Sequence, residues 1–331
     1  MQQAYHFIWS LLGAVSIFFH LFLVFSGIVP NLISRPTHMI LALPWALLFV
    51  SNSVWEARTG IIFFIIGCSC CVWVILNEAY LSDQYGSLTG SFQLTIGGCL
   101  LIVVLEMARR SIGWPLPCVA SVALLYGLFG DYIPGQFGHP GMPLSSFLGS
   151  LTITEGGLWG QLTGISMNVV AIFIILGAVL NSGDAGKGFI NIAKAAAGKL
   201  EGGAAKVSVI ASAFFGSISG SASANVASTG AITLPTMKKL NYPKSFAGAV
   251  EAVASSGGQI MPPLMGAGAF VMVELTGVPY SSIMQAAILP AILFFFAVWV
   301  GINCYARRFT LGRLPLAEMP KQKEIIISSL F

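Results

Sequence analysis

The chain has 331 residues, of which 56% are hydrophobic and 8% are charged, with a formal net charge of +4. Because a soluble domain carries roughly 25% charged residues, this composition excludes a water-soluble globule and predicts an all-α polytopic membrane protein. The basic residues are spread over loops and do not form one face, which argues against a nucleic-acid partner.

The first 130 residues contain five apolar runs, which predict membrane spans near 5–29, 37–54, 60–77, 91–108 and 113–130. The first run lacks a basic leading segment and a small-residue cleavage site, so we expect a retained helix and not a signal peptide. All six cysteines lie in apolar runs, and the run with Cys68, Cys70 and Cys71 contains no histidine or carboxylate, so we expect no transition-metal site. Glu106 is expected to form a structural ion pair with Arg109 and Arg110.

A Gly- and Pro-rich segment between residues 131 and 165 is the longest predicted outer loop. Its second half, Leu144 to Leu162, is expected to lie on the membrane surface as an amphipathic helix. A sixth span follows at about 165–181. Lys187 to Leu200 then has the spacing of a helix in the membrane interface with snorkelling lysines, and a plain connecting helix is the alternative.

A helical hairpin is predicted at 206–238, where two apolar runs meet at a Gly/Ser-rich tip around Gly216 to Asn225. Only about 30 residues separate Lys206 from Lys238, whereas two membrane crossings need about 40. Lysines at both ends place both ends on the cytoplasmic side. The segment therefore reads as a re-entrant hairpin, whose tip survives at membrane depth only where protein or a water-filled cavity satisfies its polar groups.

Charge placement supports this count of spans. With a cytoplasmic N-terminus, every one of the sixteen basic residues except Arg35 falls on the inner side, as the positive-inside bias requires. Treating the hairpin as a single crossing would place Lys238, Lys239 and Lys244 outside.

A broken helix is predicted at 245–276, followed by a last span at 281–306. Gly257 and Gly258 favour unwinding, and Pro262 and Pro263 remove backbone donors and clash with the preceding turn. The break comes about a dozen residues after Lys244, near the middle of the bilayer. The count is then about eight transmembrane helices, one of them broken, plus the re-entrant hairpin.

Two interrupted helices that meet at mid-membrane offer complementary charge. Helix C-termini present carbonyl oxygens that suit a hard cation such as Na⁺, and helix N-termini present donors that suit a carboxylate. We expect backbone carbonyls around Ser217–Gly220 and Ser255–Gly258 to be the cation ligands, assisted by side-chain oxygens.

Other interpretations of these residues stay open. Gly216 and Gly220 also match the small-residue spacing that lets two membrane helices pack closely. Glu251 is the one carboxylate well inside a predicted span, which marks it as a candidate for proton or ion coupling. It is equally able to pair with Lys244, about two turns away.

The same segments carry a resemblance to a known family. Phe215 to Val226, Asn241-Tyr242-Pro243, Phe246 to Ala252 and Gly257 to Pro263 resemble, in this order, the large permease subunit of tripartite ATP-independent periplasmic (TRAP) transporters. The similar version is a fused permease that works with a TAXI-type solute receptor. Residues 1–110, with Arg35-Pro36-Thr37-His38, resemble the small four-helix subunit, and residues 111–331 resemble the first half of the large one.

The resemblance implies an elevator-type secondary transporter in a bacterial or archaeal cytoplasmic membrane. It would import a small organic acid, delivered by a periplasmic solute-binding protein, using a Na⁺ or H⁺ gradient and no other cofactor. By position, the expected cation- and substrate-binding residues are Ser217, Ser219, Gly220, Ser221 and Asn225 at the hairpin tip and Ser255, Ser256, Gly257, Gly258 and Pro262 at the break.

The chain departs from this family in one respect. The family's large subunit has two inverted repeats, each with a hairpin and a broken helix, and only one set is found here. Because such transporters bind between their repeats, we expect the chain to be half of the machinery, either truncated or completed by another polypeptide, and unable to transport alone.

Two rival functions are open to this sequence. A membrane hydrolase is disfavoured because the tip does not spell G-x-S-x-G and no H-E-x-x-H occurs. A non-transporting scaffold or channel subunit is the stronger alternative, since half of a repeat pair can serve only to hold an assembly together.

Overall fold

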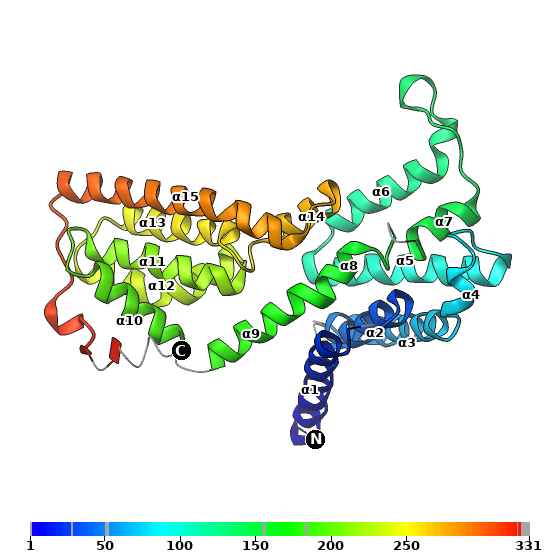
Figure 1. The fold of residues 1–331 in the computed structure, drawn as a ribbon, viewed down its shortest axis with the longest axis horizontal. Helices are drawn as coiled ribbons and strands as arrows, with labels where there is room; N and C mark the ends of the chain where they lie inside the picture. Colours follow the sequence, from blue (N-terminus) through cyan, green and yellow to red (C-terminus); the bar gives the residue numbers. More distant parts are fainter. Residues whose placement is uncertain are drawn as a thin grey trace. The chain divides into compact units, whose positions relative to one another are not determined.

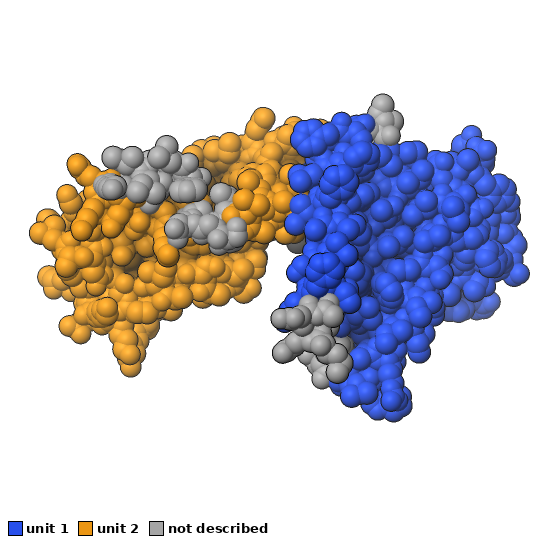
Figure 2. Space-filling view, turned by 90° about the horizontal axis from the view of Figure 1, so that it is seen from below, with its two compact units in different colours: residues 1–169 blue, residues 170–331 orange. Residues whose placement is uncertain are grey.

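The chain folds into two compact units, Met1–Val169 and Val170–Phe331, which are coloured separately in Figure 2. The structure is a computed structural model and describes residues 2–27, 29–49, 53–154, 157–182, 185–322 and 324–325. The boundary predicted at residue 110 separates the segments that resemble the family's small and large subunits. It does not describe how the helices pack, and it stays a prediction.

The first unit is a bundle of apolar helices (Figure 1). They are α1 (Gln2–Ser26), α2 (Asn31–Pro44) with a π-helical continuation over Trp45–Phe49, α3 (Val54–Leu76), α4 (Glu78–Ser82), α5 (Gly90–Ile112), α6 (Pro115–Phe129), α7 (Leu144–Thr152) and α8 (Gln161–Ile165). Local signals set several ends: the Ser53 hydroxyl caps α3 by accepting from the Glu56 N–H at 3.1 Å, and α5 stops at Gly113, whose φ is +92°. The core lies where α2, α3 and α5 meet, around Leu43, Cys71 and Leu100.

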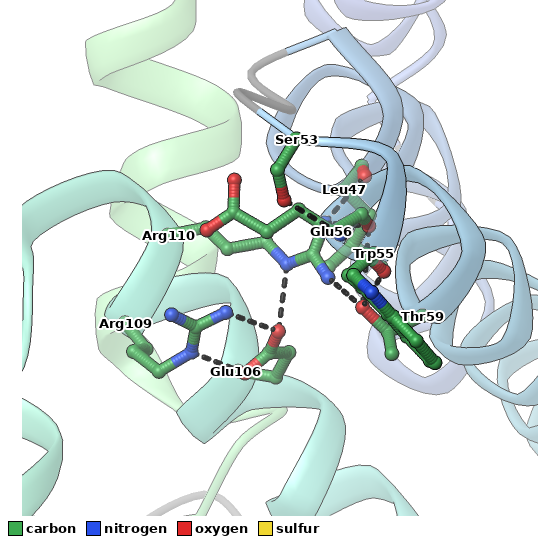
Figure 3. A network of polar contacts seen from close by, with 8 residues as sticks. All are labelled: Leu47, Ser53, Trp55, Glu56, Thr59, Glu106, Arg109 and Arg110. Carbon is green, nitrogen blue, oxygen red and sulfur yellow. Dashed lines mark hydrogen bonds and ion pairs between the residues drawn. The ribbon is translucent and has the colours of Figure 1, made fainter.

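A buried arginine ties three segments of this unit together (Figure 3). Arg110 on α5 donates to Glu106 Oε1 at 2.7 Å, to the carbonyls of Leu47 at 2.8 Å and Glu56 at 2.9 Å, and to Thr59 Oγ1 at 2.9 Å. Glu106 also accepts two bonds from Arg109. The predicted ion pair of Glu106 is thus confirmed, and Arg110 in addition donates to the carbonyl of Leu47 in the π-helical segment that follows α2.

The segment 144–162, which the sequence predicts to contain a surface helix, is helical over its first part. Its helical part, α7, ends at Thr152 and buries Leu148, Gly149 and Thr152. Gly97 of α5 comes close to Leu148, and a Cβ there would lie 3.6 Å from the Leu148 Cβ. One face of α7 is thus buried against the protein, and the location of this segment at the membrane surface stays a prediction.

A histidine fastens the loop that follows α6. His139 directs Nδ1 at the Pro140 carbonyl, 2.9 Å away, and Nε2 at the Tyr126 carbonyl, 3.0 Å away. Both partners are acceptors, so only the doubly protonated imidazolium satisfies both contacts. These carbonyls, with the nearby Asp131 carboxylate, raise the pKa of His139 above its ordinary value near 6.5.

This arrangement predicts a loop that loosens as pH rises. A raised pKa in the folded state means that the contact stabilises fully below pH 6.5 and is lost as pH rises through the higher folded-state value. Hydrogen exchange at residues 133–139, corrected for the intrinsic pH dependence, should therefore accelerate as the pH rises above about 6.5. His139→Gln is the control, because it should remove the dependence; a loop with pH-independent corrected exchange in both proteins would contradict the assignment.

The second unit holds the predicted hairpin and broken helix. Its helices are α9 (Ala171–Ser182), α10 (Ala185–Ala197), α11 (Gly203–Ser219), α12 (Ala222–Lys239), α13 (Lys244–Gly257), α14 (Ala267–Thr276) and α15 (Tyr280–Arg308). Helices α11, α12 and α13 pack against one another, with α10 on one side of this group and α15 on the other (Figure 1). The shared core is built from small side chains such as Ala205, Ala211 and Ala254, which let these backbones approach closely.

Within the described residues, seven helical segments are long and apolar enough to cross a membrane. They correspond to the predicted spans other than 245–276, which the structure divides into α13 and α14. The all-helical polytopic architecture is thereby confirmed. The segment Lys187 to Leu200 is largely α10, which buries Ile190, Ala193 and Ala197 against its neighbours.

Candidate functional site

The hairpin tip and the helix break touch through their main chains. Gly216, in the last turn of α11, lies so close to Gly258 that a Cβ on Gly216 would be 2.3 Å from the Gly258 Cα. A Cβ on Gly220, whose φ is +59°, would be 1.9 Å from the Met265 carbonyl oxygen. The Leu264 N–H donates to the Ser217 carbonyl at 3.3 Å. Gly216 and Gly220 therefore allow two main-chain segments to pack closely, in agreement with the small-residue interpretation of their spacing.

Two helix C-termini consequently meet at this contact. Helix α11 ends at Ser219 and α13 at Gly257, and the aligned peptide dipoles give each end roughly half a negative charge. A site between them favours a positive ion.

Asn225 adds an oxygen without a partner. Its side chain is 1% exposed, and its Nδ2 donates to the Ser212 carbonyl at 2.8 Å. Its Oδ1 is buried and has no hydrogen-bond partner among the described residues, which leaves an amide oxygen without compensation for its lost hydration. Gly258 adjoins this side chain, since a Cβ there would lie 2.7 Å from Nδ2. Such an oxygen is a ligand that Na⁺ accepts.

A cavity of about 650 Å³ opens beside the break. Gln259, Met265 and Gly266 line one part of it, and the first turn of α14 lines another through Gly268 and Ala269. Gly266, the residue before α14, supplies no side-chain cap. The first N–H groups of α14 therefore lack a capping side chain, and they form the kind of end that binds carboxylates.

The structure brings some of the predicted site residues together and separates others. Four of them meet at the contact between the hairpin tip and the break. They are Ser217, through its carbonyl group, and Gly220, Asn225 and Gly258. Ser219 and Ser221 lie at the tip, where the Ser221 hydroxyl caps α12 by accepting from the Ala224 N–H at 3.4 Å. Pro262 lies in the segment between α13 and α14.

Three residues of the break face elsewhere. Ser256 is exposed, and its hydroxyl donates to the Ala252 carbonyl within its own helix at 2.8 Å. Gly257 faces α15, because a Cβ there would be 2.4 Å from the Phe294 ring. Ser255 is fully buried and directs its hydroxyl toward Glu251 and Ser212.

Glu251 lies in a cluster of hydroxyl groups. Its Oε2 accepts from Ser208 at 2.7 Å and from Thr233 at 2.6 Å. Its Oε1 accepts from Thr229 and, at 3.5 Å, from Ser255. These hydroxyls come from α11, α12 and α13. They are the hydrogen-bond partners of Glu251, for which the sequence had left open a pairing with Lys244.

The residues Ser208, Thr229 and Thr233 were not anticipated from the sequence. A signal for two of them exists, because Asn225, Thr229 and Thr233 recur every four residues. That spacing places them on one face of α12, which is a polar stripe inside an apolar segment.

Comparison with known proteins identifies the family. The model of the "Tripartite ATP-independent periplasmic transporter, DctM component" matches residues 99–331. The chain belongs to the DctM family of TRAP transporters. The family's description is that of a transporter component, and the seven membrane-spanning helices of the described residues agree with it.

Several relatives of this DctM family chain share part of its sequence. The chain is 35% identical over 136 residues to the "C4-dicarboxylate TRAP transporter large permease protein DctM" of Rhodobacter capsulatus (37% of this chain, 31% of that protein). It is 28% identical over 175 residues to the "Isethionate TRAP transporter permease protein DctMQ" of Oleidesulfovibrio alaskensis (47% and 28%). An uncharacterized protein of Sinorhizobium fredii, y4mL, matches at 27% over 210 residues (62% and 45%). The chain thus spans less than half the length of these relatives.

Proposed function

We propose that this chain is the cation-binding half of an ion-gradient-driven permease that imports a small organic acid. The observation that carries the proposal is the buried, unpartnered Oδ1 of Asn225 beside the C-terminal ends of α11 and α13. A cation bound there would satisfy this oxygen and the two helix ends together. Na⁺ is the coupling ion that such oxygen ligands favour, and H⁺ carried by Glu251 is the alternative.

The substrate class follows from the break and from the relatives. Uncapped N–H groups at the start of α14 border a cavity large enough for a small organic acid, and they would attract its carboxylate. The relatives named above carry a C4-dicarboxylate and isethionate in their names, which supports an organic anion for this chain.

The remaining parts of the proposal concern the assembly. We place the chain in a bacterial or archaeal cytoplasmic membrane, with its N-terminus in the cytoplasm and residues 1–110 acting as a fused small subunit. A TAXI-type periplasmic receptor would deliver the substrate. A second inverted repeat would supply the other half of the binding site, and the hairpin and broken helix would move together as the transport domain.

The proposal is tested by uptake into proteoliposomes that contain the complete permease and its receptor, with Na⁺ and H⁺ gradients imposed separately. Asn225→Ala should lower ion-driven uptake by about ten-fold to a hundred-fold, since a lost ligand to a charged group costs about 1.5–3 kcal/mol. Ser228→Ala is the matched control, because Ser228 lies one turn further along α12, is exposed and bonds only the Ala224 carbonyl. Unchanged ion-dependent uptake by Asn225→Ala would favour the scaffold function instead.

A further inference from the structure

Glu251 is a buried carboxyl group that has no basic partner. The residue is 1% exposed, and hydroxyls are the only groups that contact its two oxygens in the described part of the chain. Lys206, the buried lysine of the neighbouring helix, faces away from it. Its Nζ donates to Asn303 at 2.9 Å and lies 5.0 Å from the Trp299 ring centroid, both on α15.

The hydroxyl cluster is suited to an ionised carboxylate. Four hydroxyl groups can donate to the two carboxyl oxygens of Glu251, and together they would occupy the roughly four lone-pair positions of a carboxylate. The contacts from Ser208 and Thr233, at 2.7 and 2.6 Å, have the length of hydrogen bonds from a hydroxyl to a charged oxygen. A buried negative charge with only neutral partners remains costly unless a cation lies near.

The same hydroxyls connect Glu251 to Asn225. Thr229 Oγ1 contacts both the Glu251 carboxylate and, at 2.9 Å, the Asn225 carbonyl. Ser212 Oγ lies 3.3 Å from Thr229 Oγ1 and 3.5 Å from Ser255 Oγ, while the Ser212 carbonyl accepts from Asn225 Nδ2. The carboxylate is therefore joined through shared hydroxyls to the residue whose Oδ1 lacks a partner.

We infer that Glu251 is the fixed counter-charge of the cation bound at Asn225, and that it acts as a positioning residue without touching the ion. This inference rests on the proposed cation site and assigns Glu251 a role different from proton carriage. Opposite charges in a protein interior attract strongly enough to change cation affinity by about ten-fold to a hundred-fold.

The test compares the Na⁺ dependence of thermal unfolding for the full chain in detergent, with choline replacing Na⁺ at constant ionic strength. A ligand that binds only the folded state raises its melting temperature. The half-effective Na⁺ concentration should be about ten-fold to a hundred-fold higher for Glu251→Gln than for the wild type, and unchanged for Ser228→Ala.

Glu251→Gln is expected to fold. The amide has the shape of the carboxyl group, and its NH₂ group can donate to a neighbouring hydroxyl. Thr229 and Thr233 can then turn their own protons to the carbonyls of Asn225 and Thr229, which lie at 2.9 and 3.0 Å. A purely structural role for Glu251 would lower the melting temperature equally at every Na⁺ concentration and leave the half-effective concentration unchanged.

The outcomes separate the two proposals. If the wild type unfolds at the same temperature with and without Na⁺, both the cation site and the counter-charge are refuted. If the wild type responds and Glu251→Gln responds at the same Na⁺ concentration, only the counter-charge is refuted. Infrared spectra of the Na⁺-bound wild type with ¹³C-labelled glutamate provide a measurement that needs no variant. They should lack a protonated-carboxyl C=O band, and the presence of that band would overturn the inference.

Discussion

Gly216→Ala should lower the free energy of unfolding of the second unit by about 2–3 kcal/mol, as overpacking of a tight contact does. The new Cβ would lie 2.3 Å from the Gly258 Cα and 3.2 Å from its carbonyl oxygen. Both neighbours are main chain, so no side-chain rotation relieves the clash, and the hairpin must move away from the break.

Gly248→Ala is the matched control for this variant. Gly248 lies in helix α13, and a Cβ there has no heavy atom within 4 Å, so alanine should leave stability unchanged or raise it by up to about 1 kcal/mol. Thermal unfolding of the purified chain in detergent measures both variants. Equal melting temperatures for the two would show that the Gly216–Gly258 contact is not maintained in solution.

Arg110→Lys should destabilise the first unit by about 3 kcal/mol. The Arg110 side chain is 3% exposed, and its planar guanidinium donates in several directions at once to Glu106, Thr59 and the carbonyls of Leu47 and Glu56. A lysine ammonium is one compact group on a flexible stem and cannot reach all four acceptors. The buried Leu47 carbonyl would then lose this donor, at about 1–3 kcal/mol, and the ion pair with Glu106 would weaken.

Arg109→Lys provides the comparison for Arg110→Lys. Arg109 is 21% exposed and pairs with the same glutamate, while its guanidinium carbon lies 5.3 Å from the Trp114 ring centroid. Its replacement should cost less than about 1 kcal/mol, as for partly exposed ion pairs. The melting temperatures of the two variants are measured under the same conditions. Similar decreases in melting temperature would mean that the carbonyl contacts of Arg110 do not contribute to stability.

Most helices could be predicted because their signals are local. Lys206 and Lys238 bracket a stretch too short for two crossings, and the structure has a hairpin of α11 and α12 there. Gly257 and Gly258, followed by Pro262 and Pro263, predicted the break, and α13 ends at Gly257. Glycine and proline act on their own backbone, so no knowledge of packing partners was needed.

The orientation of side chains was less accessible from the sequence. Ser255 and Ser256 are identical and adjacent, yet one is fully buried and the other exposed, because successive residues on a helix point about 100° apart. Which of the two faces the core depends on how α13 sits against α11 and α12. The carbonyl partners of Arg110 were missed for the same reason, since Leu47 and Arg110 meet only in the folded unit.

The contact between Gly216 and Gly258 also bears on how a transport cycle can proceed. The two main-chain segments touch with no side chains between them, so no side chain can change its rotamer to let the contact widen gradually. Gradual separation of the two segments would expose main-chain polar groups before it opened a path for an ion or solute. We therefore expect the two interrupted helices to travel as one block, and access to the ion to change by displacement of that block against its surroundings.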